Sequence, residues 1–134
     1  MVDFKLIILI IGLIASLVTV SSCIPLTFRL AMKKQTTGLS AAFSIFIIIA
    51  GIFWLIYAGL LYEQLKTAAN ITVAISASVP IIITNGMGII CHLINLMVKY
   101  QMINGAKKNN MTEKQFCDLF HQKQIQKKLA KSKK

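Results

Sequence analysis

Few side chains that could do chemistry lie within the apolar runs of this chain, and they are of kinds that bind rather than react. Trp54 is the only tryptophan, Asn85 is an amide inside an apolar run, and His92 is the only ionisable side chain deep in such a run. The four acids all lie outside these runs: Asp3, Glu63, Glu113 and Asp118. Ion-coupled pumps normally bury carboxylates or histidine relays, so a carboxylate-driven pump is not expected.

No sequence motif of a hydrolase, a redox enzyme or a nucleotide-binding protein is present. The P-loop, the zinc-protease helix motif and the nucleophile elbow are all missing from the sequence. The cysteines at positions 23, 91 and 117 lack the paired spacing of metal ligands, which predicts reduced thiols. We therefore expect neither an enzyme nor a bound cofactor or metal.

Small and polar residues recur along two apolar runs at helical spacing. At 100° per residue, one stripe covers about 60° of a helix; its members are Gly12, Ser16, Thr19 and Cys23. A second stripe covers about 80°; its members are Asn85, Gly88, His92 and Asn95. Small residues let membrane helices approach, and hydroxyls bond across them, so we favour packing for the first stripe. For Asn85 we favour a binding role, because a buried amide needs several partners.

Three uncharged stretches must position these residues: 6–28, 35–62 and 67–98. A membrane-spanning helix needs about 20 apolar residues, and backbone groups inside a bilayer must bond internally, which favours helices. The expected fold is an all-α membrane protein with a three-helix transmembrane unit over residues 1–104. We place its spans near 6–30, 40–61 and 79–98. The Ala-, Ser- and Thr-rich segment 67–78 is expected to form a loop or an interfacial turn within a long linker, 62–79.

Composition and charge agree with a membrane protein that carries a basic tail. The 134 residues are 56% hydrophobic and 14% charged, whereas soluble domains carry about 25% charged residues. Fifteen Lys and Arg residues oppose four acids, and ten of the fifteen lie from Lys99 onward. The positive-inside rule then predicts a multi-pass cell-membrane protein with a cytoplasmic Lys33–Lys34 loop and C-terminus, and an outside N-terminus. Abundant Ile and Lys with a single Arg indicate an AT-rich bacterial genome.

A signal peptide is the alternative interpretation of the first apolar run. Val20-Ser21-Ser22-Cys23 is similar to a lipoprotein cleavage site, and such leaders are removed. However, the sequence after Cys23 stays apolar and two more apolar runs follow. We therefore interpret the run as a membrane span.

Three runs carry a similarity to a known family. One segment resembles the PQ-loop signature of the SWEET and SemiSWEET sugar transporters: Cys23-Ile-Pro-Leu-Thr-Phe-Arg-Leu-Ala-Met-Lys-Lys-Gln-Thr-Thr-Gly-Leu-Ser40. Two further segments resemble the next two spans of that family: Gly51-Ile-Phe-Trp54-Leu-Ile-Tyr57-Ala-Gly and Pro80-Ile-Ile-Ile-Thr-Asn85. The resemblance covers about residues 8–100, and one three-helix unit of this length resembles a SemiSWEET, the bacterial half-size form.

The resemblance implies that Trp54 and Asn85 bind a sugar. An aromatic ring covers the C–H face of a sugar, and an amide pairs with its hydroxyls. Three helices are too few to enclose a path, so we expect a parallel homodimer that places both residues twice about an axis, as parallel repeats do in larger carriers.

The resemblance also gives Pro25 the role of a hinge, with a static kink as the alternative, because proline removes a helical hydrogen bond. Candidate gates are Phe43 and Phe46 on the inner side and Tyr57 on the outer side. Two positions depart from the family pattern: Leu26 stands where the family has Gln, and Leu61 stands where it often has Arg.

The tail, residues 105–134, is predicted to be cytoplasmic and basic. Thr112-Glu-Lys-Gln115 has the spacing of a capping box, and Phe116, Leu119 and Phe120 follow at i, i+3 and i+4. This pattern predicts a short amphipathic helix on anionic lipid of the inner leaflet, or else a disordered solubilising tail. No nucleic-acid-binding module is visible, so we expect no nucleic-acid partner.

These observations predict a membrane carrier. We expect uncoupled, downhill transport of a mono- or disaccharide by alternating access in a homodimer within the lipid bilayer. The alternatives are a small holin-like pore former, and a PQ-loop transporter of an amino acid or another small solute. Ion coupling through His92 stays open.

Overall fold

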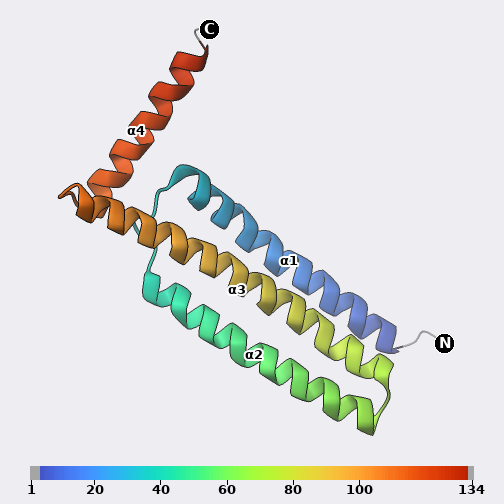
Figure 1. Cartoon of the computed structure of the whole chain (residues 1–134). Coiled ribbons are helices and arrows are strands. Elements are labelled where there is room, and N and C mark those ends of the chain that lie inside the picture. Colours follow the sequence, from blue (N-terminus) through green and yellow to red (C-terminus); the bar gives the residue numbers. More distant parts are fainter. Residues whose placement is uncertain (1–3, 133–134) are drawn as a thin grey trace.

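Four helices make up the described part of the chain. A computed structural model describes the backbone of residues 4–132, and the side chains except at positions 4–6, 8, 127–128 and 131–132. Helices α1 (Phe4–Lys33), α2 (Ala41–Ala68) and α3 (Ile71–Lys108) run side by side, and α4 (Glu113–Ser132) leaves at one end (Figure 1). The first three are long and apolar enough to cross a membrane. The fold is that of a multi-pass α-helical membrane protein with three candidate spans.

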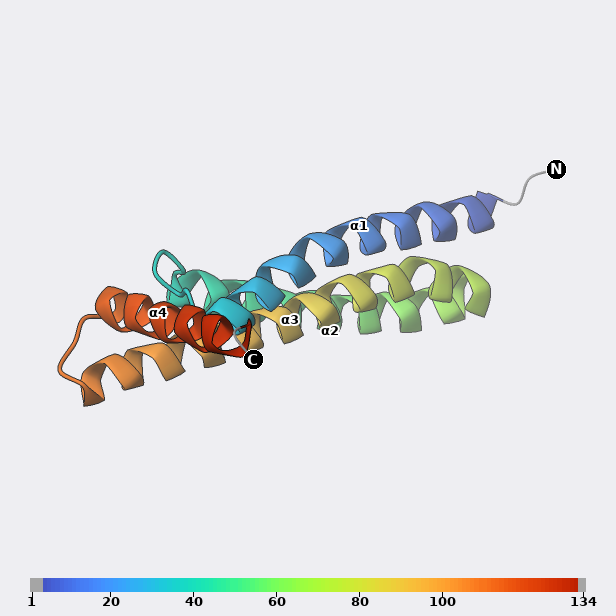
Figure 2. The ribbon, with the colours of Figure 1, turned by 90° about the horizontal axis from the view of Figure 1, so that it is seen from above.

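Helix α3 forms the centre of the bundle. It packs against both α1 and α2, whereas α1 and α2 make at most marginal contact with each other (Figures 1 and 2). The buried residues of α2 are small and spaced by seven positions: Ser44, Gly51 and Ala58. Such a stripe of small residues lets two membrane helices approach closely. Helices α1 and α2 are therefore held together through α3.

Helices α2 and α3 form a hairpin with a connection of only two residues, Ala69 and Asn70. Asn70 caps α3, because its side chain accepts a hydrogen bond from Val73 N at 3.0 Å. The expected loop or turn over 67–78 is therefore confined to Ala69 and Asn70, and the long linker over 62–79 is wrong, because the rest of both segments is helical. Two hydroxyls of the segment 67–78 donate to carbonyls of their own helix: Thr67 Oγ1 to Glu63 O at 3.1 Å and Ser76 Oγ to Thr72 O at 2.8 Å. These two side chains satisfy their hydrogen bonds without leaving the helix, whereas Ser78 Oγ is buried without a partner among the described residues.

Helix α3 is longer than a membrane is thick. Its 38 residues span about 57 Å at 1.5 Å per residue, against a hydrocarbon core of about 30 Å. Figure 2 shows its Lys-rich end extending past α1 and α2. The three predicted spans lie inside α1, α2 and α3, except for position 40, which is the N-cap of α2. Each helix continues beyond its predicted span, and the overhang of α3 is where α4 attaches.

The tail folds as a helix up to Ser132. Thr112 N donates to Gln115 Oε1 at 2.9 Å, and Gln115 N donates to Thr112 Oγ1 at 3.3 Å, so the predicted capping box is confirmed. A Cβ at Gly105 of α3 would lie 2.5 Å from the Phe116 ring, so only glycine allows this contact. Cys117 is buried beside it, with 1% of its surface exposed. A disordered tail is therefore wrong for α4.

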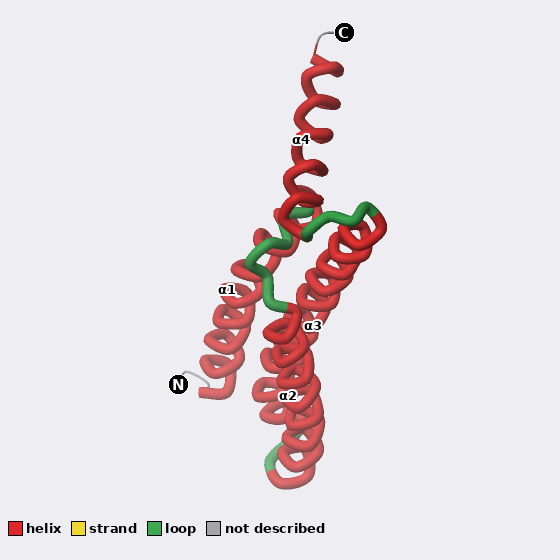
Figure 3. Tube along the Cα trace, turned by 90° about the vertical axis from the view of Figure 1, so that its left-hand side faces the viewer, coloured by secondary structure: helices red, strands yellow, loops and turns green. Residues whose placement is uncertain are grey.

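A cluster of three residues ties α4 to the rest of the molecule, and we call it the clasp: Thr36 and Lys99, which are buried, and Glu113, which is half-buried. Lys99 Nζ lies 2.7 and 2.8 Å from the Glu113 carboxylate oxygens and donates to Thr36 O at 3.1 Å. Thr36 Oγ1 donates to Glu113 Oε1 at 2.7 Å, and Thr36 is fully buried. The clasp joins α3, α4 and the loop between α1 and α2, which meet at the base of α4 (Figure 3).

Candidate binding groove

A close contact between α1 and α3 sets one wall of the candidate site. Ser16 is buried, and its Oγ lies 2.9 Å from both Gly12 O and Pro80 O. Thr84 Oγ1 donates to Ser16 Oγ at 2.7 Å. Gly12 makes the approach possible, because a Cβ there would lie 2.8 Å from Pro80 Cγ. Gly12 and Ser16 thus form the helix contact expected for the first stripe.

A concavity of about 340 Å³ lies beside this contact, and α1, α2 and α3 all line it. We call it the binding groove; its lining residues are Gly12, Ala15, Ser16, Thr19, Trp54, Pro80, Ile81, Thr84 and Asn85. The structure thus brings Trp54 of α2 and Asn85 of α3 to the same groove. The groove is open on one side, and Trp54 is 51% exposed.

The amide of Asn85 has free hydrogen-bonding capacity in this groove. Among the described residues it makes one hydrogen bond, from Nδ2 to Ile81 O of its own helix at 2.9 Å. Its carbonyl oxygen and second N–H therefore have no protein partner. An amide carries two donor hydrogens and an acceptor oxygen, so it can still bond to a ligand hydroxyl in both directions.

Aromatic surface is concentrated on the exposed side of α2. Trp54 and Tyr57 meet edge to face, with ring centroids 5.5 Å apart and planes at 89°. A second concavity of about 360 Å³ lies against Ala50, Phe53, Trp54 and Tyr57. The Trp54 ring therefore presents an apolar surface beside the polar groups of Asn85 and Thr84. This combination suits a ligand with C–H groups on one face and hydroxyls on its edge.

The candidate gate residues differ in their surroundings. Phe43 lies edge to face with the His92 ring, at 6.1 Å between centroids, so it bridges α2 and α3. Phe46 is 70% exposed and makes no ring contact with the described residues. Tyr57 adjoins Trp54. A gating role of all three residues stays a prediction, as does the hinge at Pro25, which lies exposed within the continuous helix α1.

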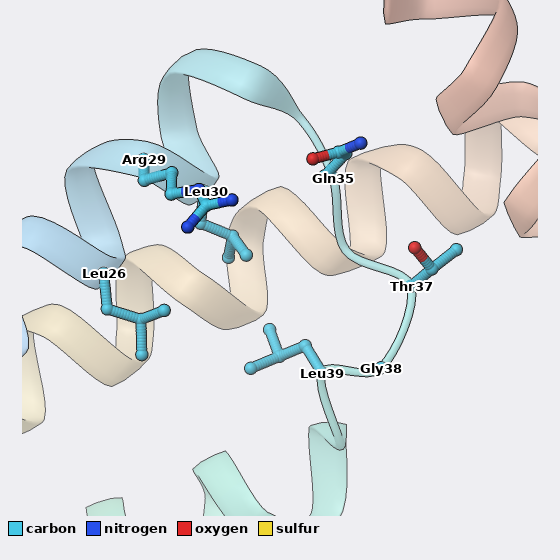
Figure 4. Close-up of a pocket in the computed structure, with 7 residues that line it drawn as sticks. All are labelled: Leu26, Arg29, Leu30, Gln35, Thr37, Gly38 and Leu39. Carbon is cyan, nitrogen blue, oxygen red and sulfur yellow. The ribbon is translucent and has the colours of Figure 1, made fainter.

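A further cavity, which the sequence reasoning missed, lies at the Lys-rich end of α1. It measures about 510 Å³ between α1 and the α1–α2 loop, and its lining residues are Leu26, Arg29, Leu30, Gln35, Thr37, Gly38 and Leu39. Figure 4 shows the Leu26 and Leu39 side chains extending into the space between helix and loop. The available signal was Leu26 itself, the position at which the resemblance to the sugar transporters breaks.

The second polar stripe does not act as one surface. Asn85 lies in the groove, whereas Asn95 is 2% exposed and its Oδ1 has no hydrogen-bond partner in the described structure. The Nδ1 atom of His92 is also buried without a partner. Although these residues share one arc of the helix, the Asn85 amide is accessible, whereas Asn95 Oδ1 and His92 Nδ1 are buried.

Known proteins give no independent guide to this groove. Neither a protein-family model, nor a curated protein, nor a solved structure matches the chain. Within the described residues, no three His, Cys, Asp or Glu side chains gather in a way that could hold a metal ion. The case for a function therefore rests on the groove and on the motifs in the sequence.

Proposed function

We propose that this protein is a membrane carrier that binds a mono- or disaccharide at Trp54 and Asn85. The observation that carries the proposal is the shared groove: a half-exposed indole from α2 and an amide with unused hydrogen-bonding capacity from α3 line one concavity. Thr84 and Ser16 add hydroxyls to the same lining. The SemiSWEET-like motifs in the sequence agree with this assignment.

A second copy of the chain would complete the site. The groove has walls from three helices and one open side, on which Trp54 is 51% exposed. A parallel homodimer that apposes two grooves would enclose the open sides and supply two copies of Trp54 and Asn85. Alternating access would then open the paired grooves to one side of the membrane at a time, with Pro25 as the hinge in α1.

Transport is proposed to follow the concentration gradient. No acid among the described residues lines the groove, since Glu63, Glu113 and Asp118 lie near helix ends or in α4. Coupled carriers use intramembrane ionisable groups to bind the driving ion. Within the uncharged stretches 6–28, 35–62 and 67–98, His92 is the one histidine and no Lys, Arg, Asp or Glu is present. Its ring contacts Phe43 rather than lining the groove.

Uptake into proteoliposomes tests the function. A panel of radiolabelled sugars and amino acids should show saturable uptake of at least one sugar, with a final inside-to-outside ratio near one that a proton uncoupler leaves unchanged. A ratio far above one that collapses with the uncoupler would contradict downhill transport and implicate His92. Uptake of an amino acid in preference to the sugars would show that the groove binds amino acids rather than sugars. Release of a large trapped dye would identify a holin-like pore instead.

Membrane orientation follows from the Lys and Arg bias. In a variant without the native thiols, a cysteine at the exposed loop position Thr37 (Thr37→Cys) should resist an impermeant maleimide in intact cells. The matched variant Gln64→Cys, at the exposed opposite end of α2, should react from outside. The reverse pattern would invert the proposed orientation.

A further inference from the structure

We propose that α4 is a docking helix for an anionic phospholipid surface, and that it binds through the side that carries Gln124. Helix α4 lies outside the binding groove, so this docking is a property separate from transport. It requires that the Lys-rich end of the bundle meets a membrane surface, but it does not require that the substrate is a sugar.

Helix α4 runs across the end of the bundle (Figure 1). Helix α4 leaves the end of α3 crosswise to the long axis of the bundle, and its distal half extends past α1 (Figure 1). The clasp and the contact between Gly105 and Phe116 fix its first turn. Because the bundle axis crosses the membrane, a helix crosswise to that axis runs along the membrane surface.

One side of α4 faces the end of the bundle. Gln124 Nε2 donates to Met32 O at the end of α1 at 3.2 Å, so the Gln124 side of α4 faces the end of the bundle. Where α4 continues past α1, the same side faces the lipid around the bundle. This side is therefore the candidate contact with headgroups.

The distal part of α4 is strongly basic. Six lysines and no acid follow Asp118 in the sequence. At 100° per residue, positions 127, 128 and 131 fall within about 60° of Gln124, and all three are lysines. Positions 122 and 126 fall about 160° from Gln124 on the opposite side, and both are glutamines. On the backbone of α4, the positions on the side that faces the end of the bundle are thus occupied by lysines, as complementarity to lipid phosphates requires.

Amide hydrogen exchange of the full-length protein in nanodiscs tests the proposal. Exchange within residues 119–132 should be slower in discs that contain phosphatidylglycerol than in discs of phosphatidylcholine alone, and high salt should remove the difference. The decisive variant is Gln122→Lys/Gln126→Lys/Lys127→Gln/Lys128→Gln, which keeps composition and net charge but moves two lysines to the opposite side. It should lose about 30-fold of the phosphatidylglycerol-dependent protection, since each lysine near an anionic surface contributes about fivefold.

The matched control is Lys127→Arg/Lys128→Arg, which keeps both charges on the docking side and should keep the protection. Equal protection in the two lipids would overturn the proposal. Undiminished protection in the charge-moved variant would also overturn it, because net charge alone, or the opposite side of α4 with Ile125 and Leu129, would then account for the effect.

Discussion

Glu113→Ala is expected to release α4 from the bundle. The substitution removes both carboxylate oxygens that accept hydrogen bonds from the buried Lys99 Nζ. Thr36 O is then its remaining hydrogen-bond partner among the described residues. Removing one member of a buried ion pair typically costs about 3–5 kcal/mol, and the 25% exposure of the Glu113 side chain places the cost at the lower end. The population with α4 undocked should therefore rise by about 100-fold.

Cys117 reports this release directly. Its thiol is 1% exposed and lies 3.6 Å from Thr36 Oγ1, so a maleimide can reach it only when α4 moves away. Labelling followed by mass spectrometry distinguishes it from Cys23 and Cys91. We expect Glu113→Ala to increase the labelling rate of Cys117 by about the same factor as the undocked population.

Two variants separate the clasp from a general effect of charge. Glu63→Ala removes the acid of an exposed pair, in which Lys66 lies 4.0 Å away, and should leave Cys117 protected. Lys99→Met/Glu113→Met replaces the buried pair with apolar groups and should restore much of the protection, because no unpaired buried charge remains. A parental labelling rate in Glu113→Ala would show that the clasp does not hold α4.

Trp54→Ala and Asn85→Ala should each remove most uptake at low substrate concentration. Asn85→Ala deletes the amide whose carbonyl oxygen and second N–H are free for a ligand. Loss of a hydrogen-bonding group from a site typically costs about 1–3 kcal/mol, which corresponds to about 5–150-fold in affinity. Trp54→Ala removes the indole surface that α2 contributes to the groove, and we expect a loss of the same order.

Each substitution has a matched control. Tyr100→Ala removes an exposed aromatic ring from α3, away from the groove and from the aromatic surface of α2, and should transport like the parent. Asn104→Ala removes an exposed amide of α3 far from the groove, with the same expectation. Migration of all four variants in detergent like the parent would show that assembly is intact. Parental uptake by both groove variants would refute the site assignment.

The three apolar helices could be predicted because their cause is local. Each uncharged stretch is long enough to cross a bilayer, and a backbone in lipid has to be helical. The capping box at Thr112 and Gln115 was equally readable, since its two partners are three residues apart. The segment 67–78 was misjudged because its Ser, Thr and Ala residues suggest a turn in isolation, whereas the Thr67 and Ser76 hydroxyls bond within the helices.

The clasp was not predictable from local patterns. Thr36 lies 63 residues before Lys99, and Glu113 lies 14 residues after it, across a helix end. Nothing near Lys99 distinguishes it from the nine lysines that follow in the tail. In the groove, helical periodicity correctly grouped Gly12 with Ser16, but it also grouped Asn85 with Asn95, which the three-dimensional packing separates into an accessible and a buried position.

The central position of α3 has a consequence for biosynthesis. The ribosome delivers α1 and α2 first, yet these helices pack chiefly against α3 and only marginally against each other. Until α3 enters the bilayer, Ser16 lacks its partners Pro80 and Thr84, and the small-residue stripe of α2 has no helix to pack against. The main helix contacts therefore form only after α3 is present, and a nascent chain halted before Ile71 leaves two unpaired helices exposed to quality-control proteases of the membrane.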